Sequence, residues 1–424
     1  SLCFFQLGLS KDSVMNGRDF NDLNQKLNLR LTGSISSDDG HVSGISKDDR
    51  LMFIENLARM RQISLESQWH DSDDVVGWFE LERFANGLRL FKNDRLLIDY
   101  TDMLQLFLDR GRAPKLDVMF VDEAQDLSPL QWAVVRKLCE SADRIYIAGD
   151  DDQAIYRWAG ADVDYLIRNS KNAMVLKQSY RIPKSIHTLA ERCIGQVASR
   201  VQKTWNPRKE AGHVSWEKSY ESIDMETGDW LVLARTNYLL NGIEEHCRSE
   251  GWFYKTKNRN SVSEKKVKAV RDWETLRKGG EIPLVDLIKV LNYMRVSVPT
   301  SLERNDFDSN ISFEEAQSYL PDLKQEYWYD LFDGISVSER SYIRAMLRRG
   351  EKITKEPRIK LSTIHAAKGG EAENVILLTD ISNRIYKSYQ ANPDDESRVF
   401  YVGLTRAKQN LFLIEPQTQK YFQI

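Results

Sequence analysis

Apolar residues fall along the chain in short runs, and the residues that end these runs indicate an α/β fold. The run Val118–Val121 ends in Asp122 and Glu123, and the run Arg144–Ala148 ends in Gly149. Runs that are apolar on both faces and finish in acid or glycine are typical of buried strands in a parallel sheet, whose carboxyl ends carry the functional site. The pattern therefore predicts two parallel strands with candidate chemistry at their ends.

The segments around these strands alternate between helical and extended patterns. Leu130–Ala142 has the pattern of a crossover helix, with Pro129 near its first turn. After Pro183, apolar residues recur on one face of another helix, at Ile186, Leu189, Ala190, Cys193, Ile194 and Val197. A second block of strand candidates comprises Trp230–Ala234, Ile359–Thr363, Val375–Leu378 and Leu411–Ile414. These patterns predict two α/β sheets.

Two stretches interrupt this alternation. Residues 14–98 are polar and rich in helical patterns, such as Leu51–Arg61 and Trp78–Phe91, with a Ser/Asp/Gly loop near Thr32–Ser46. Residues 259–357 are also charged, helical and loop-rich. Each stretch is interpreted as a mainly helical insertion into an α/β domain. A chain of 424 residues is long enough for more than one domain.

The composition excludes several classes of protein. Hydrophobic residues make up 41% of the chain and charged residues 29%, and no apolar run approaches the ~18 residues of a membrane span. The net charge of −3 means that any nucleic-acid contact must come from a local groove, which weakens a histone-like interpretation. Cys3, Cys139, Cys193 and Cys247 are far apart, which argues against a zinc site and for a reducing, intracellular compartment, here taken as cytoplasmic. No signal-peptide pattern follows Ser1.

The adjacent acids after the first strand are the strongest chemical candidates. Asp122 at the strand tip can hold a hydrated Mg²⁺, which prefers one or two carboxylates plus substrate phosphates. Glu123 beside it could orient or deprotonate an attacking water. An Asp-Glu pair alone is more often a charged turn, but the apolar run ahead of it favours a site. A nuclease that uses Asp122, Glu123 and Asp126 for metal-dependent cleavage is one alternative.

Six segments, in this order, resemble the motifs of superfamily 1 DNA helicases of the UvrD/Rep/PcrA type. They are DEAQD from Asp122, GDDDQAIYRWAGA from Gly149, QSYR from Gln178, LARTN from Leu233, TIHAAKGGEAENV from Thr363 and YVGLTRAK from Tyr401. The resemblance implies two RecA-like P-loop NTPase-type domains with parallel sheets, 1A at 1–13 and 99–179 and 2A at 180–258 and 358–424. The insertions would be the accessory subdomains, 1B at 14–98 and 2B at 259–357.

The resemblance also implies a site for ATP and Mg²⁺ between the two domains. Asp122 would bind the metal, Glu123 would activate water, and Gln153 would contact the γ-phosphate without adding negative charge. Two arginines would reach the γ-phosphate from the second domain, Arg181 and Arg406, although single arginines are more often surface ion-pair partners. By the same resemblance Tyr180 would stack on adenine, Glu371 would bind ribose, and Gly369 would allow a close backbone approach.

The remaining motif residues are expected to contact single-stranded DNA. By resemblance these are Tyr156, Trp158, Arg235, Thr236, Asn237, Thr363 and His365. An aromatic ring can stack on any base, and Thr, Asn and His can bind phosphates without reading sequence. A lone tryptophan is more often a core residue, but Trp158 follows Gln153 so closely that one loop would touch both ATP and DNA. Asp150 and Asp152 are expected to serve Mg²⁺ and the hydrogen bonds of this loop.

The expected function is an ATP-dependent helicase or translocase on single-stranded DNA and on junctions with duplex, moving 3′ to 5′, with replication or repair proteins as possible partners. The chain departs from the family in lacking a P-loop: no Gly-Lys-Thr or Gly-Lys-Ser occurs, and SLCFFQLGL resembles the segment that follows one. This predicts a copy truncated before Ser1 that hydrolyses ATP poorly. Ala159 and Gly370 also depart from the family. A single-strand-binding or regulatory module without ATPase activity is the other alternative.

Overall fold

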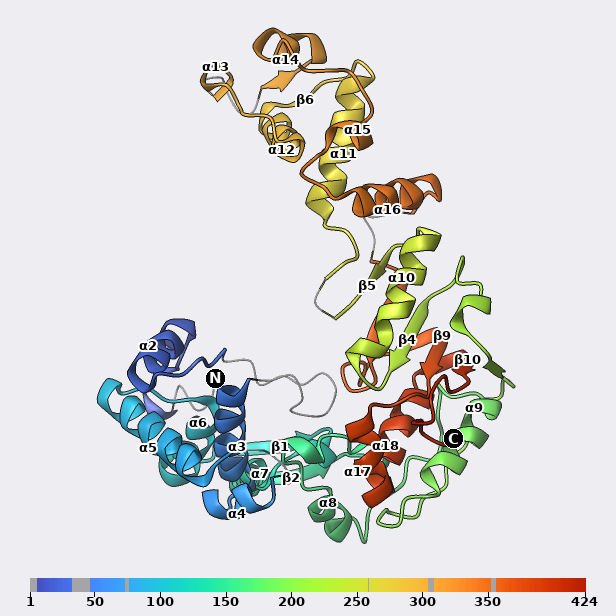
Figure 1. Ribbon diagram of the computed structural model, residues 1–424. Coiled ribbons are helices and arrows are strands. Elements are labelled where there is room, and N and C mark those ends of the chain that lie inside the picture. Colours follow the sequence, from blue (N-terminus) through green and yellow to red (C-terminus); the bar gives the residue numbers. More distant parts are fainter. Residues whose placement is uncertain (1–5, 33–45, 73–75, 258, 304–308, 352–355) are drawn as a thin grey trace.

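The computed structural model describes residues 6–32, 46–72, 76–257, 259–303, 309–351 and 356–424. Two α/β units lie side by side, and a helical region extends from each of them (Figure 1). This is the predicted α/β class with two parallel sheets, each unit carrying mainly helical additions. The predicted loop at Thr32–Ser46, except for its two end residues, and Cys3 lie outside the described residues.

The first α/β unit contains the two strands predicted from the acidic run ends. β1 (Leu116–Val121) and β2 (Ala142–Ile147) pair in parallel, joined by α7 (Pro129–Cys139) as the crossover helix. Ser128 caps α7 by accepting a hydrogen bond from the Gln131 N–H, with proline at the first helical position. The helix ends before the predicted Ala142 because that residue already begins β2. The unit also contains α6 (Tyr100–Arg110), α8 (Val163–Asn169) and the 3₁₀ turns η1 (Lys11–Ser13), η2 (Ala124–Asp126), η3 (Asp151–Gln153) and η4 (Arg157–Ala159).

One face of this small sheet is open in the described part of the chain. On the covered face, Val121 packs against Trp132 of α7. On the other face, the rings of Phe120 and Tyr146 stack at 5.1 Å and are 75% and 51% exposed. Burial of these strands on both faces was therefore a wrong expectation for the residues described, where only two strands pair and one helix covers them.

The second α/β unit contains a six-stranded, all-parallel sheet with the strand order β3-β10-β9-β4-β8-β5. All residues of β4 are buried, as its continuous apolar run predicted. The bounds of the strands are β3 (His213–Glu217), β4 (Trp230–Ala234), β5 (Tyr254–Lys255), β8 (Ile359–Thr363), β9 (Ala372–Leu378) and β10 (Ala407–Ile414). The helices are α9 (Lys184–Ile194), α10 (Asn241–Glu250), α17 (Asn383–Ala391) and α18 (Pro393–Leu404), with the turns η5 (Tyr220–Ser222) and η6 (Asn237–Leu240).

The first helical region lies beside the small sheet and comprises α2 (Gly17–Leu27), α3 (Lys47–Arg61), α4 (Leu65–His70) and α5 (Trp78–Arg95). α3 begins one turn before the predicted Leu51, because Ser46 caps it by accepting from the Asp49 N–H. Its core is a cluster of buried apolar residues from all of these helices except α4, and Trp158 of η4 packs against the same cluster. These helices fall within the stretch predicted as 1B.

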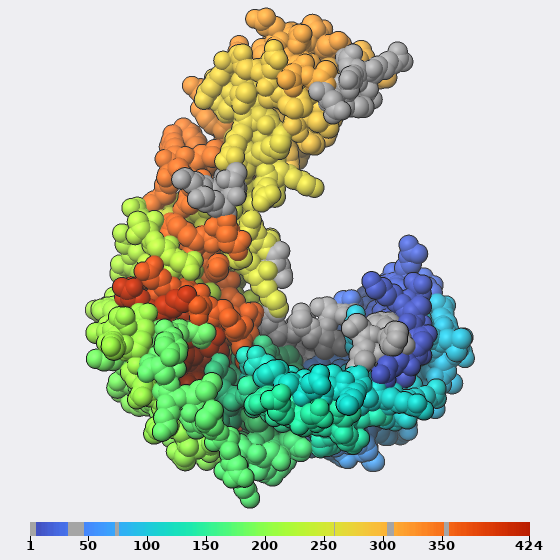
Figure 2. All heavy atoms as spheres, turned by 180° about the vertical axis from the view of Figure 1, so that it is seen from behind, coloured from blue at the N-terminus to red at the C-terminus, as the bar shows by residue number. Residues whose placement is uncertain are grey.

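The second helical region projects away from the six-stranded sheet (Figure 1), and the molecule forms an open crescent in the space-filling view (Figure 2). Its helices are α11 (Glu264–Arg277), α12 (Leu284–Met294), α13 (Thr300–Glu303), α14 (Phe313–Tyr319), α15 (Trp328–Leu331) and α16 (Val337–Arg348), with a short antiparallel pair, β6 (Ile282–Pro283) and β7 (Asn310–Ile311). The core of this region is continuous with that of the large sheet. Among the described residues, no helix is long and apolar enough to cross a bilayer.

Candidate functional site

The two predicted catalytic acids lie at the carboxyl end of β1. Asp122 and Glu123 are both exposed, and the Glu123 N–H donates to Asp122 Oδ1 at 2.9 Å. Glu123 has a φ of +52°, a left-handed conformation that a non-glycine residue adopts at a cost. This conformation follows from the sharp turn between β1 and η2. The turn places both carboxylates at the edge of the sheet that faces the second α/β unit.

Gln125 and Lys368 connect this turn to its surroundings. The Gln125 carboxamide donates to Glu123 Oε2 at 2.5 Å and accepts from the Asp150 N–H at 2.9 Å, so it links the ends of β1 and β2. From the second unit, Lys368 Nζ lies 2.5 Å from Asp126 Oδ2 and 3.7 Å from Glu123 Oε2. Burial raises the pKa of Asp126, and Lys368 acts against that rise. Lys368 thus contributes a positive charge from the opposite domain.

Gln153 and Arg406, which sequence reasoning assigned to the γ-phosphate, are brought together. The Gln153 carboxamide donates to Asp150 Oδ2 at 2.7 Å and accepts from an Arg406 guanidinium nitrogen at 3.3 Å. Arg406 is 1% exposed, and it also donates hydrogen bonds to neutral oxygens, including the Val402 carbonyl at 2.9 Å. Burial, and then the nearby Arg181, lower the pKa of Arg406 to about 10. The guanidinium is therefore a buried cation beside a second cation.

Two of the predicted nucleotide-binding residues, Arg181 and Glu371, lie close enough to act on the charge of Arg406. Arg181 Nε donates to Glu371 Oε2 at 2.5 Å, and Lys408 Nζ lies 2.5 Å from Glu371 Oε1. The hydrogen bond from Lys408 holds the pKa of Glu371 below its usual value. Gly369 has a φ of +82°, which favours glycine. The Tyr180 ring is 87% exposed, as a stacking platform would be.

The side chains fit Mg²⁺ with a nucleotide better than a metal held by protein alone. Mg²⁺ needs one or two carboxylates plus phosphates, and Asp122 is an exposed carboxylate next to Glu123. A phosphate near Arg406 and Arg181 would offset the repulsion between two guanidinium groups. The nuclease alternative fares less well, because Asp126 is ion-paired with Lys368 and the described residues contain no group of three or more His, Cys, Asp or Glu side chains suited to a metal.

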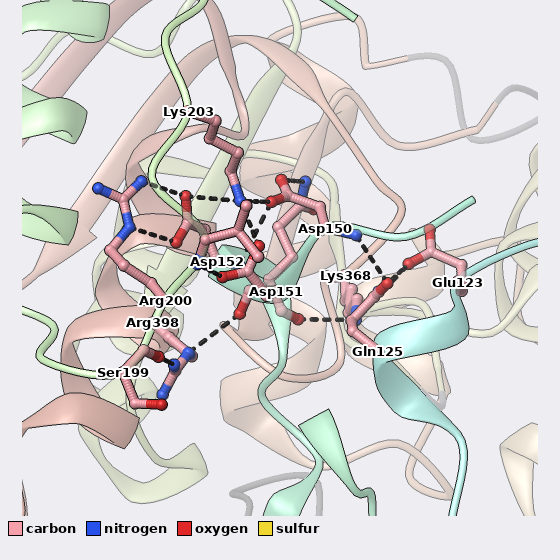
Figure 3. Close-up of polar contacts among 12 residues, drawn as sticks. Glu123, Gln125, Asp150, Asp151, Asp152, Ser199, Arg200, Lys203, Lys368 and Arg398 are labelled. Atoms are coloured by element: carbon pink, nitrogen blue, oxygen red, sulfur yellow. Dashed lines mark hydrogen bonds and ion pairs between the residues drawn. The ribbon is translucent and has the colours of Figure 1, made fainter. Parts of the chain in front are cut away.

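The carboxylates of the three aspartates after β2 are held by cations of the second unit, and the expected role of Asp150 and Asp152 toward Mg²⁺ stays a prediction. Their carboxylates lie against Lys203 and Arg200, which follow α9 (Figure 3). Asp152 is fully buried, and Arg200 binds it through two nitrogens at 2.8 and 2.5 Å. Asp150 retains the expected role within its own loop, because it accepts from Gln153.

Two of the predicted DNA-binding residues meet across the domains, and a third lies beside the helical region. The Tyr156 hydroxyl donates to the His365 carbonyl at 3.2 Å, and the two rings are 6.2 Å apart. Trp158 stacks on Phe53 of α3, with ring centroids at 6.1 Å and an angle of 19° between the planes. The tryptophan is half-buried rather than bare, since one of its neighbours is an aromatic ring of the same chain.

The other predicted DNA-binding residues differ in exposure. Thr236, Thr363 and His365 are buried side chains at the ends of β4 and β8, while Asn237 is exposed. Arg235 is 2% exposed and forms two hydrogen bonds of 2.7 Å with Glu396 of α18. The guanidinium of Arg235 thus joins β4 to α18, and its expected contact with DNA stays a prediction.

Sequence reasoning missed five polar side chains at the junction. Gln125 lies in the DEAQD segment and Lys368 in the TIHAAKGGEAENV segment, so their positions in these motifs could have marked them as candidate site residues. No motif marks the other three, because Arg200, Lys203 and Arg398 lie outside all six motif segments. Arg398 Nε donates to the Asp151 carbonyl at 3.0 Å. Only the folded structure brings these residues against the aspartates.

The fold and the site define a protein of the RecA-like helicase class, with acids on one α/β unit facing arginines on another. Residues 53–174 match the model of the UvrD/REP helicase N-terminal domain, and residues 333–418 match that of the UvrD-like helicase C-terminal domain. The two matches support a superfamily 1 DNA helicase enzyme of the UvrD/Rep/PcrA type.

Individual relatives agree over most of the chain. A probable DNA helicase II homolog of Rickettsia conorii is 21% identical, with 99% of this chain and 82% of the relative covered. The ATP-dependent DNA helicase PcrA of Bacillus subtilis is 22% identical over 79% of this chain and 60% of its own length. The ATP-dependent DNA helicase srs2 of Schizosaccharomyces pombe is 23% identical, covering 86% and 53%.

Proposed function

We propose that this protein couples ATP hydrolysis between its two α/β domains to movement along single-stranded DNA, in the 3′ to 5′ direction. The observation that carries the proposal is the path of one loop. Gln153 of that loop hydrogen-bonds to Arg406, and Tyr156, three residues further on, hydrogen-bonds to the His365 backbone. Movement of the arginines on phosphate binding would therefore shift this loop and, with it, the residues expected to bind DNA. Acting on DNA would place the protein in the cytoplasm.

Each side chain has a physical task in this scheme. Asp122 would hold Mg²⁺, Glu123 would orient water, and Arg406 with Arg181 would meet the phosphates. Tyr180 is exposed as required for stacking on the base, and Glu371 lies close enough to Arg181 to respond to its movement. Bound Mg²⁺-ATP supplies the phosphoanhydride whose cleavage drives the cycle.

On the DNA side, Tyr156 and Trp158 would provide aromatic surface, and Asn237, Thr236, Thr363 and His365 would bind the backbone. Arg235 is left out of this set because its guanidinium is bound to Glu396. Single strands and their junctions with duplex are the proposed substrates. Replication or repair proteins are the proposed class of partner, as for a motor that opens duplex DNA.

We also propose that the 424-residue polypeptide on its own hydrolyses ATP slowly, because it contains no Gly-Lys-Thr or Gly-Lys-Ser to cradle the phosphates. In that case its own activity would be that of a single-strand-binding module.

The test compares the 424-residue polypeptide with the product of its whole reading frame. Binding of a fluorescent single-stranded oligonucleotide, ATP hydrolysis with and without that DNA, and unwinding of 3′-tailed against 5′-tailed duplexes are measured for both. Gln153→Ala should abolish DNA stimulation of hydrolysis and leave oligonucleotide affinity within about twofold, with exposed Gln202→Ala as the control. Failure of both polypeptides to bind single strands, or a preference for 5′ tails, would contradict the proposal.

A further inference from the structure

Three consecutive aspartates after β2 share one ammonium group. Lys203 Nζ lies 2.7 Å from Asp150 Oδ1, 2.5 Å from Asp151 Oδ1 and 3.0 Å from Asp152 Oδ2 (Figure 3). The Lys203 side chain is 13% exposed, and those of Asp151 and Asp152 are 5% and 0% exposed. Buried carboxylates need such compensation, because desolvation disfavours their charged form. We call these three residues the aspartate cluster.

The aspartate cluster joins the two α/β domains. Its carboxylates follow β2 of the first unit, whereas Arg200 and Lys203 lie between α9 and β3 of the second. Arg200 binds Asp152 through two nitrogens, and the Val201 N–H donates to Asp151 Oδ2 at 2.8 Å. Arg398 of α18 donates to the Asp151 carbonyl and to the Ser199 carbonyl, so it ties both sides together.

The cluster also reaches the candidate catalytic amide. One oxygen of Asp150 contacts Lys203, and the other accepts from Gln153 Nε2 at 2.7 Å. The remaining end of the Gln153 carboxamide accepts from Arg406. Asp150 therefore fixes which way the amide points, and Lys203 fixes Asp150. Burial disfavours the ionised form of Asp150, but Lys203 and Gln153 outweigh it and hold the pKa of Asp150 below its usual value.

We propose that Lys203, together with Arg200, is a positioning residue: it fastens the aspartate cluster to the second domain and thereby keeps the Gln153 carboxamide directed at Arg406. The fastening is a property of the polypeptide itself. Its consequence for ATP hydrolysis rests on the proposed function. Both residues act through the carboxylates that they contact, Lys203 through Asp150 and Asp152 and Arg200 through Asp152.

Lys203→Met removes the ammonium and leaves the side-chain length nearly unchanged, while exposed Lys209→Met in the same segment is the matched control. Hydrogen exchange of the 424-residue polypeptide should become about tenfold faster or more in residues 149–157 of the first variant, and stay unchanged in α5. Lys209→Met should match the wild type, and Lys203→Arg should recover most of the protection, since it restores the charge. Equal exchange in Lys203→Met and wild type would overturn the proposal.

A pH series separates this role from simple packing. In Lys203→Met the pKa values of the cluster rise, because buried carboxylates then face one another with less compensation. A carboxyl whose folded pKa is raised loses stability as pH increases, so the deficit in melting temperature should grow as the pH rises above about 4, the ordinary pKa of an aspartate. A deficit independent of pH would contradict the electrostatic role. Among the described residues, the charged and titratable groups that interact with the cluster are Arg200, Lys203, Arg398 and Tyr401, and Glu191 acts on Arg200 and Tyr401.

If Lys203→Met does not fold, the double variant Lys203→Met/Asp152→Asn removes one charge of each sign and takes its place. Asp150 still lacks its cation there, so exchange in 149–157 should remain fast; protection equal to wild type would again overturn the proposal. Oligonucleotide binding and ATP hydrolysis of the wild type are measured separately. Their failure would remove the proposed function and leave the exchange result intact.

Discussion

Arg235 offers a sharp test of how its motif is used in this protein. The guanidinium and the Glu396 carboxylate share two hydrogen bonds of 2.7 Å, and their side chains are 2% and 5% exposed. Arg235→Met removes the cation and leaves a buried, uncompensated carboxylate. Breaking one side of a buried pair costs about 3–5 kcal/mol, whereas replacing both partners with apolar residues is often close to neutral. We therefore expect a large loss in Arg235→Met and substantial recovery in Arg235→Met/Glu396→Leu.

Equilibrium urea unfolding, followed by far-ultraviolet circular dichroism, measures these free energies. Glu226→Gln is the control, because the ion pair of Glu226 with Arg349 is exposed and such pairs contribute about 1 kcal/mol or less. Oligonucleotide affinity is then measured at several salt concentrations on the folded variants. A lost phosphate contact with single-stranded DNA lowers the slope of log K against log salt by about 0.7, whereas a buried structural pair leaves the slope unchanged.

The opposite result would be an Arg235→Met variant that unfolds at the same urea concentration as the wild type and whose oligonucleotide affinity depends less steeply on salt; it would refute a structural role for Arg235. That result would mean that the guanidinium leaves Glu396 to bind a phosphate. Loss of stability in Arg235→Met, recovery in the double variant and an unchanged salt slope in both support the structural role.

Three further predictions concern other parts of the molecule. Trp158→Ala should weaken single-strand binding about 5- to 150-fold, since stacking of one base on an aromatic ring contributes roughly 1–3 kcal/mol. Phe53→Leu removes only the ring on which Trp158 stacks and should change the affinity less. Equal losses of affinity in anisotropy titrations of the two variants would refute direct stacking of a base on Trp158. Phe120→Lys places a charge on the open sheet face and should reduce both aggregation and binding of the dye ANS, which binds exposed apolar surface. Exposed Lys171→Met is the control, and unchanged dye fluorescence in Phe120→Lys would count against an apolar open face. Burial of Asp99 is outweighed by its hydrogen bonds to Arg59 and by Lys92, so the pKa of Asp99 is lowered; the stabilisation is present above about pH 4 and is lost as the pH falls further. Asp99→Asn should cost roughly 1–2 kcal/mol of unfolding free energy at pH 7 and should weaken the fall of the melting temperature at acid pH. An unchanged fall of the melting temperature would disprove this prediction.

The sequence predicted the buried strands well and the edge strands poorly, for a physical reason. β4, β8 and β9 lie inside the six-stranded sheet: β4 and the end of β9 are continuous apolar runs, and β8 alternates buried and half-buried residues. β3 and β5 lie at its two edges. β3 contains exposed and polar residues, and β5 has only two residues, so neither produces a strong periodic signal. The same limit explains α3, whose first turn consists of polar residues that apolar periodicity does not detect.

Candidate site residues were predictable as positions but not as partners. Gln153, Arg406 and Glu123 could be found because each is near the end of an apolar run within a recognisable motif. Lys203 could not, because its role depends on three aspartates about fifty residues away in sequence, and no local pattern encodes a contact formed between two domains. Trp158 shows the same limit: its spacing from Gln153 is visible in the sequence, whereas its contact with Phe53 depends on how α3 packs.

Arg235 and Arg406 show what decides the role of an arginine once its position is known. Both follow or precede buried strands of the same sheet, and both are almost completely buried. Arg235 has a carboxylate partner of equal and opposite charge, so its charge is already satisfied. Arg406 is bound to carbonyl oxygens and to a neutral amide, and burial beside Arg181 lowers its pKa to about 10. A buried cation whose hydrogen bonds go to neutral groups gains most from an anion, which is why Arg406 and not Arg235 is the better candidate for a phosphate.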